Sequence, residues 1–116
     1  MVSLLEVGTA GELADGAMRE VTANGQAVLL ARVGSTYYAA AGRCPHMGGH
    51  LSRGELEGTV VTCPLHGSQF DLKDGRVVRW LKGSGLLSRV GRALRSPRPL
   101  TTYRVEVKDG KVMLEI

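Results

Sequence analysis

The chain carries two short segments that decide its fold, CPHMGG at residues 44–49 and CPLHGSQFD at residues 63–71. Together they hold both cysteines of the chain and two of its three histidines. Each segment contains proline and glycine, which favour loops over regular structure. We therefore expect two loops that each present one thiol and one imidazole, from Cys44 and His46 and from Cys63 and His66.

The mixture of ligand types within each loop bears on the identity of the metal. Two thiolates and two imidazoles can bind a single Zn²⁺ ion or a [2Fe–2S] cluster. Structural zinc sites usually pair like ligands at close spacing, cysteine with cysteine and histidine with histidine. Here each loop supplies one of each, which fits two iron atoms, one bound by both thiolates and the other by both imidazoles. Zinc remains the alternative.

The two segments closely resemble the paired loops of the Rieske [2Fe–2S] proteins, and most of the remaining chain resembles small soluble Rieske ferredoxins. This resemblance implies one [2Fe–2S] cluster, with Cys44 and Cys63 on the inner iron. It places His46 and His66 on the outer iron, which is the more exposed of the two. It also implies that Ser68 donates a hydrogen bond to a bridging sulfide.

Two features of high-potential Rieske proteins are missing from this sequence. Those proteins carry an additional cysteine in each loop and join the two in a disulfide, whereas the matching positions here are Gly49 and Leu65. They also have a tyrosine whose hydroxyl donates to a cysteine sulfur, where this chain has Phe70. Because donors to the sulfurs stabilise an added electron, we expect a reduction potential in the lower part of the Rieske range of about −150 to +300 mV.

Outward from the loops, the sequence predicts an all-β fold. Asn24-Gly25, Asp74-Gly75 and Asp109-Gly110 are typical of two-residue turns between antiparallel strands. Residues 103–108 alternate between apolar and charged side chains, as expected of a strand with one buried face. The resemblance implies a Rieske-like antiparallel β-sandwich with a smaller cluster-binding part at about residues 43–70.

Residues 81–96 interrupt the β pattern and are an insertion relative to typical small Rieske ferredoxins. We expect a short helix near residues 84–95, because an ideal helix there gathers the apolar residues on one face. The opposite face would carry Arg89, Arg92 and Arg95. This helix either packs its apolar face on the domain or docks its arginine face on an acidic protein. Weak contact with an anionic membrane surface is a third interpretation.

Length and composition fit one globular domain over residues 1–116. Residues 1–74 hold 5 basic and 8 acidic side chains, whereas residues 75–116 hold 10 and 3. This asymmetry favours an anionic partner surface. The basic half has no recognisable nucleic-acid reading motif, so we expect no nucleic-acid partner.

The apolar runs of the chain are short. The run Ala27–Ala31 suits a buried strand and is far from the length of a membrane span. The first residues lack the basic region and long apolar region of a secretory signal. We therefore expect a cytoplasmic protein without a transmembrane segment.

The resemblance implies a soluble one-electron carrier rather than an enzyme. Its partners would be a flavin-dependent reductase as electron donor and a terminal oxygenase or similar enzyme as acceptor. One alternative is the small subunit or accessory module of a larger reductase, such as an assimilatory nitrite reductase. Another is a redox-responsive interaction protein whose basic helix binds a target according to the state of the cluster.

Overall fold

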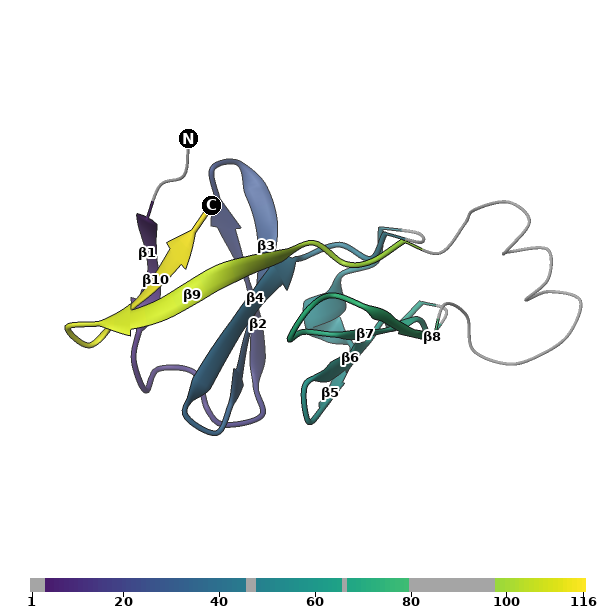
Figure 1. The fold of residues 1–116 in the computed structure, drawn as a ribbon, viewed down its shortest axis with the longest axis horizontal. Coiled ribbons are helices and arrows are strands. Elements are labelled where there is room, and N and C mark those ends of the chain that lie inside the picture. The colour runs from purple at the N-terminus through teal and green to yellow at the C-terminus, as the bar shows by residue number, and fades with distance from the viewer. Residues whose placement is uncertain (1–3, 46–47, 66, 80–97) are drawn as a thin grey trace, which may run out of the picture.

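The computed structural model describes residues 4–45, 48–65, 67–79 and 98–116, and their regular structure is β apart from one short 3-10 turn. The strands form two antiparallel sheets that lie side by side, one of six strands and one of four (Figure 1). The chain enters and leaves the four-stranded sheet from the six-stranded one, so the small sheet is an excursion between β4 and β9. This architecture confirms the all-β fold, and the small sheet, over residues 55–79, extends beyond the smaller part at about residues 43–70 that the resemblance implies.

The six-stranded sheet forms the base of the molecule, with strand order β1-β10-β9-β4-β3-β2. Its strands are β1 (Leu4–Thr9), β2 (Met18–Ala23), β3 (Gln26–Val33), β4 (Thr36–Ala41), β9 (Thr102–Lys108) and β10 (Lys111–Glu115). The turns at Asn24-Gly25 and Asp109-Gly110 are confirmed, because φ is positive at both residues of each. Each turn is followed by the paired strand at the expected register.

The two edge strands of this sheet, β1 and β2, are joined by a side chain. The register of β1 shifts between Glu6 and Gly8, which takes Val7 out of the regular ladder with β10. Arg19 of β2 donates from Nη2 to the carbonyl of Val7 over 3.1 Å. The bulge therefore leaves the carbonyl of Val7 available to accept a hydrogen bond from the opposite edge strand. The sheet is curled so that its two edge strands approach each other.

The four-stranded sheet is a meander in the order β5-β6-β7-β8. A 3-10 turn, η1 (Leu51–Arg53), precedes β5 (Glu55–Glu57), β6 (Val60–Thr62), β7 (Gln69–Asp71) and β8 (Val77–Arg79). The predicted antiparallel pairing across Asp74-Gly75 is confirmed, but the prediction of a two-residue turn was wrong. Five residues connect β7 and β8, because φ is positive at Gly75 but not at Asp74, and the turn closes through the amide of Asp71 donating to the carbonyl of Arg76 over 3.0 Å. Gly75 also accepts a hydrogen bond from the amide of Leu100 over 2.7 Å.

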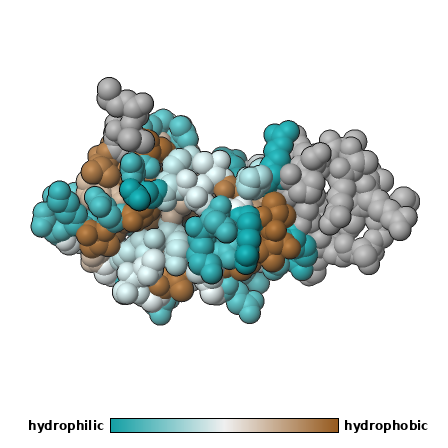
Figure 2. Space-filling view, viewed as in Figure 1, coloured by the Kyte–Doolittle hydropathy of each residue, from teal (hydrophilic) through white to brown (hydrophobic). Residues whose placement is uncertain are grey.

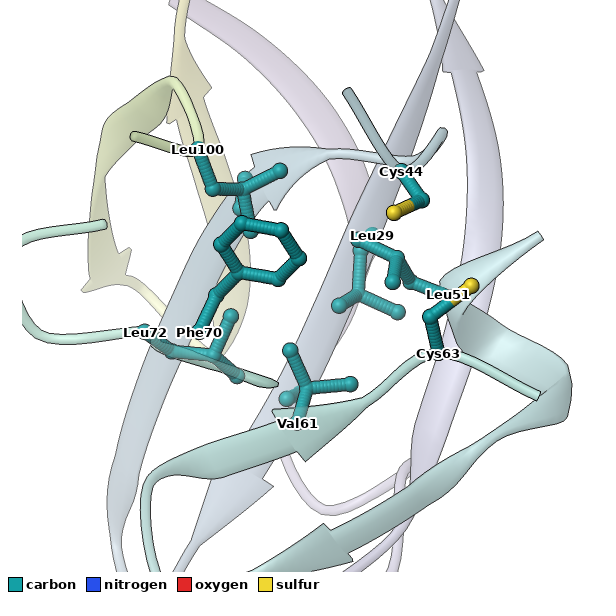
Figure 3. Packing of buried hydrophobic residues seen from close by; sticks show 10 residues of the cluster. Leu29, Cys44, Leu51, Val61, Cys63, Phe70, Leu72 and Leu100 are labelled. Atoms are coloured by element: carbon teal, nitrogen blue, oxygen red, sulfur yellow. The ribbon is translucent and has the colours of Figure 1, made fainter. Parts of the chain in front are cut away.

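The core joins the two sheets. Leu29, at a buried position of β3, belongs to one apolar cluster with Val61 and Phe70 of the small sheet (Figure 3). Val28, its neighbour in the chain, belongs to a second cluster with Leu114 of β10. β3 is thus buried on both faces, as the run Ala27–Ala31 predicts. Each such fully buried side chain stabilises the fold by about 1.5–3 kcal/mol.

The surface shown in Figure 2 is largely hydrophilic, with small separate hydrophobic patches. No helix among the described residues is long and apolar enough to cross a membrane. The predicted helix near residues 84–95, with Arg89, Arg92 and Arg95, lies outside the described residues, so the helix stays a prediction. The prediction of a single domain over residues 1–116 likewise remains untested.

Candidate metal centre

The first cysteine loop leads from β4 into η1 and is closed by two backbone hydrogen bonds. The amide of Cys44 donates to the carbonyl of Gly49 over 2.8 Å, and the amide of Gly48 donates to the carbonyl of Cys44 over 2.8 Å. Gly48 adopts φ +74°, a conformation that side-chain-bearing residues rarely take. The closure brings the start and end of the loop together.

The second cysteine loop connects β6 to β7 and closes in the same way. The amide of Cys63 donates to the carbonyl of Ser68 over 2.8 Å, and the amide of Gly67 donates to the carbonyl of Cys63 over 3.1 Å. Gly67 also has φ +74°. The two loops therefore share one backbone design, with hydrogen bonds at offsets of four and five residues from the cysteine.

The two loops lie against each other at Gly49. A Cβ atom on this buried glycine would lie 3.0 Å from the Sγ atom of Cys63 and 3.0 Å from the side chain of Leu65. A side chain at this position would crowd the thiol, and Cys63 or Leu65 would have to shift to admit it. Gly49 and Leu65 are also the positions at which high-potential relatives carry their additional cysteines, and the structure places these two residues in contact.

Both thiols are buried, with Cys44 3% exposed and Cys63 2% exposed, and they form no disulfide. They belong to the same core cluster and lie on either side of Leu51 in Figure 3. Two buried thiols from two matched loops fit the sulfur ligands of an iron–sulfur cluster, since thiolates are the ligands that such clusters prefer. The apolar residues around them limit the access of water, which also suits a redox centre.

Of the four predicted ligands, the structure describes Cys44 and Cys63. His46 and His66 lie outside the described residues. Within the described part of the chain, no three His, Cys, Asp or Glu side chains gather into a possible metal site. The roles of the two histidines, and the assignment of inner and outer iron, therefore stay predictions.

Ser68 is fully buried directly after the second loop, between Gly67 and β7. Its carbonyl accepts the hydrogen bond from the amide of Cys63, so its backbone helps to close the loop. The predicted donation from its hydroxyl to a sulfide remains untested.

Arginine side chains hold the end of each loop. Arg43 donates from Nη1 to the carbonyl of Gly48 over 3.2 Å. Arg79 of β8 donates from Nε and Nη2 to the carbonyl of Gly67 over 3.0 and 2.9 Å. From the sequence, Arg79 is only one of the ten basic residues over residues 75–116, because nothing local indicates that β8 lies beside the second loop.

His50 is the third histidine of the chain, and the sequence allows two roles for it, a donor near the cluster or an ordinary loop or surface residue. In the structure its Nδ1 atom lies 2.8 Å from Oε1 of Glu20, and both side chains are about 30% exposed. This pair joins the end of the first loop to β2 of the six-stranded sheet. The sequence could not reveal Glu20 as the partner, because 30 residues separate the two side chains.

Asp71 is the buried carboxylate at the end of β7, 3% exposed. Burial alone would raise the pKa of Asp71, but a hydrogen bond from the amide of Lys73 and one from the hydroxyl of Thr59 lower it. The positive charges of Lys73 and Arg76 act in the same direction, and the net pKa lies below its usual value. Asp71 is therefore an ionised anchor of the turn between β7 and β8.

Comparison with known sequences gives a consistent picture. The sequence profile of the Rieske [2Fe–2S] domain matches residues 3–87. "Ferredoxin CarAc" of Metapseudomonas resinovorans is 34% identical over 111 residues, which cover 93% of this chain and 89% of the relative. The "3-phenylpropionate/cinnamic acid dioxygenase ferredoxin subunit" of Escherichia coli (strain K12) is 33% identical over 90 residues, which cover 77% and 72% of the two chains.

Solved structures share the fold. The "Ferredoxin of carbazole 1,9a-dioxygenase from Nocardioides aromaticivorans IC177" matches with a TM-score of 0.80 at 23% identity, over 97% of this chain and 96% of that one. A chain of "Complex of reduced oxygenase and oxidized ferredoxin in carbazole 1,9a-dioxygenase" matches with a TM-score of 0.77 at 32% identity, over 96% of this chain and 91% of that one. The two-sheet arrangement around the matched loops is thus an arrangement already seen in ferredoxins.

Proposed function

The chain belongs to the Rieske [2Fe–2S] family, and on that premise we propose that it is the ferredoxin of an oxygenase system. It carries one [2Fe–2S] cluster and serves as an electron-transfer component rather than as a catalyst. The observation that carries this function is the contact between the two matched loops, in which Gly49 leaves room beside the buried Sγ of Cys63.

We propose that Cys44, His46, Cys63 and His66 hold the cluster. When bound, the cluster accepts and releases one electron. The chain's own part is to bury both thiols, to keep water away with the surrounding apolar core, and to fix the loops through their paired hydrogen bonds.

The finer assignment of partners rests on the relatives. We propose that this ferredoxin delivers its electron to a terminal oxygenase, since the related ferredoxin named above occurs in a complex with an oxygenase. We further propose a flavin-dependent reductase as its donor and a cytoplasmic location. Leu65, 56% exposed in the second loop, offers an apolar contact at this end, which suits a small transient interface.

The relatives also bear on the alternatives. Those reported above are named as ferredoxins or ferredoxin subunits, which favours an electron carrier over a reductase subunit or a redox-responsive interaction protein. The weak contact with an anionic surface through Arg89, Arg92 and Arg95 stays a prediction, because these residues lie outside the described residues.

The test is to purify the chain without oxygen, measure iron, sulfide and zinc, and record the electron paramagnetic resonance spectrum after reduction. We expect two iron atoms and two sulfides per chain. His66→Cys and His46→Cys should each lower the reduction potential, because a thiolate adds negative charge where a neutral imidazole stood. A folded sample that binds zinc and no iron would contradict the proposal, as would histidine variants whose potentials do not change.

A further inference from the structure

Among the described residues, Arg79 is the basic side chain that donates two hydrogen bonds to a cluster loop. It stands at the last position of β8, opposite Gln69 of β7, and its guanidinium turns toward the second loop. Two of its N–H groups, on Nε and Nη2, donate to one acceptor, the carbonyl oxygen of Gly67, over 3.0 and 2.9 Å. The contact is partly buried, so solvent screens it less than it screens an exposed charge.

Gly67 follows the predicted ligand His66 in the chain, so its position bears on that ligand. Its amide donates to the carbonyl of Cys63 over 3.1 Å, and its own carbonyl accepts from Arg79. Gly67 is thus held on both sides, from the cysteine end by the loop itself and from outside by β8. A charge-assisted contact of this kind is stronger than a neutral hydrogen bond.

The other arginines near the loops act differently. Arg43 makes a single exposed bond of 3.2 Å to Gly48. Arg76 lies 3.3 Å from the carboxylate of Asp71, which compensates its charge. Among the residues that the structure describes, no carboxylate forms an ion pair with Arg79. Within that part of the chain, no ion pair therefore offsets the positive charge of Arg79 at the second loop.

We propose that Arg79 is a positioning residue of the second cluster loop whose fixed charge also favours the reduced state. The inference rests on the proposed cluster site. The guanidinium holds the Gly67 peptide in place, and its uncompensated positive charge stabilises the electron that enters the site. Arg79 would then help to set the reduction potential without being a ligand.

The experiment compares Arg79→Gln with Arg79→Lys in the cluster-loaded protein, by redox titration and electron paramagnetic resonance. Glutamine removes the charge, and we expect it to lower the equilibrium constant for reduction about tenfold, which for one electron is about 59 mV. Lysine keeps the charge but lacks the planar guanidinium that lets Arg79 donate two N–H groups to one carbonyl. We expect it to restore most of the potential and to leave an altered resonance spectrum. Arg53→Gln, which removes a charge from an exposed position in η1, is the matched control and should change the constant less than twofold.

Two results would overturn the inference. One is an Arg79→Gln protein with a full cluster and an unchanged potential. The other is an Arg79→Lys protein whose potential falls as far as that of Arg79→Gln. Loss of the cluster in Arg79→Gln, with retention in Arg79→Lys and Arg53→Gln, would support it. Iron and sulfide are measured first in the unaltered protein, so a cluster-free sample overturns the cluster site itself, whereas loaded variants with unchanged potentials overturn only the role of Arg79.

Discussion

The loop that begins at Cys44 and the loop that begins at Cys63 have the same backbone closure, yet different sheets hold them. The first is attached to the six-stranded sheet: the amide of Gly42, just before it, donates to the carbonyl of Ala27 over 2.9 Å. At its other end, His50 pairs with Glu20 of β2. The first loop is therefore part of the base of the molecule.

The second loop is attached to the four-stranded sheet. It connects β6 and β7, whose residues Thr62 and Gln69 pair across the ladder on either side of it. Arg79 of β8 holds its end. The two loops therefore meet where the two sheets meet, so each loop can be disturbed through its own sheet while the contact between the loops is left intact.

The largest effect should come from breaking the contact between the loops. In Gly49→Ala the new methyl group would occupy the space beside Sγ of Cys63 and the side chain of Leu65. We expect most of the cluster to be lost, as measured by iron content and visible absorbance. Gly48→Ala is the control, because nothing lies within 4 Å of its Cβ position. That variant should keep the cluster and lose about 1–2 kcal/mol of stability from its positive φ. Equal cluster content in both variants would contradict the contact.

The next largest effect concerns the sheet of the second loop. Asp71→Asn replaces a buried acceptor of three hydrogen bonds, and we expect a loss of about 2 kcal/mol in the free energy of unfolding at pH 7. Urea unfolding followed by circular dichroism measures it. Asp109→Asn, in an exposed turn with φ +53°, is the control and should be nearly neutral.

The same variant predicts a pH dependence. The folded-state pKa of Asp71 is lowered, so its contribution to stability is complete above the unfolded-state pKa of about 3.9. It is lost as the pH falls through the lower folded-state value. The stability difference between the unaltered protein and Asp71→Asn should therefore be constant from pH 7 to about 5 and shrink below pH 4. A difference that grows on acidification would show that the carboxylate is not stabilising in its ionised form.

A smaller effect is expected from the anchor of the first loop. Glu20→Gln weakens the pair with His50, whose two side chains are about 30% exposed, so the loss should be about 0.5–1 kcal/mol. A double-mutant cycle with His50→Gln isolates the interaction. A coupling energy of zero would mean that the first loop is held by its backbone contacts alone.

The smallest effect concerns the potential rather than stability. Phe70 is fully buried in the same apolar cluster as both cysteines. Phe70→Tyr adds a hydroxyl that can donate to a sulfur, and we expect it to raise the reduction potential by less than about 59 mV. For one electron this is a less than tenfold change in the equilibrium constant for reduction. The unaltered protein should titrate in the lower half of the range of about −150 to +300 mV. A potential in the upper half, or a fall in Phe70→Tyr, would contradict this.

Much of the secondary structure follows from local sequence. The turn at Asn24-Gly25 lies directly between β2 and β3, and the alternating residues 103–108 lie within β9, which begins one residue earlier. The two-residue turn predicted at Asp74-Gly75 was wrong in its length: φ is positive at Gly75 but not at Asp74, and the carbonyl of Gly75 accepts from Leu100, 25 residues further on. Local preferences predict a turn but not the partner that reshapes it.

The sequence by itself determined the candidate ligand residues, the two loops and the all-β character, since these depend on residue chemistry and on short-range periodicity. Only the tertiary structure decided that Gly49 touches Cys63, that Glu20 meets His50, and that Arg79 reaches Gly67. Each of these contacts joins residues from different strands or loops. Such contacts form only when the two sheets pack, because the free energy of burying the shared core, rather than any local preference, brings their ends together.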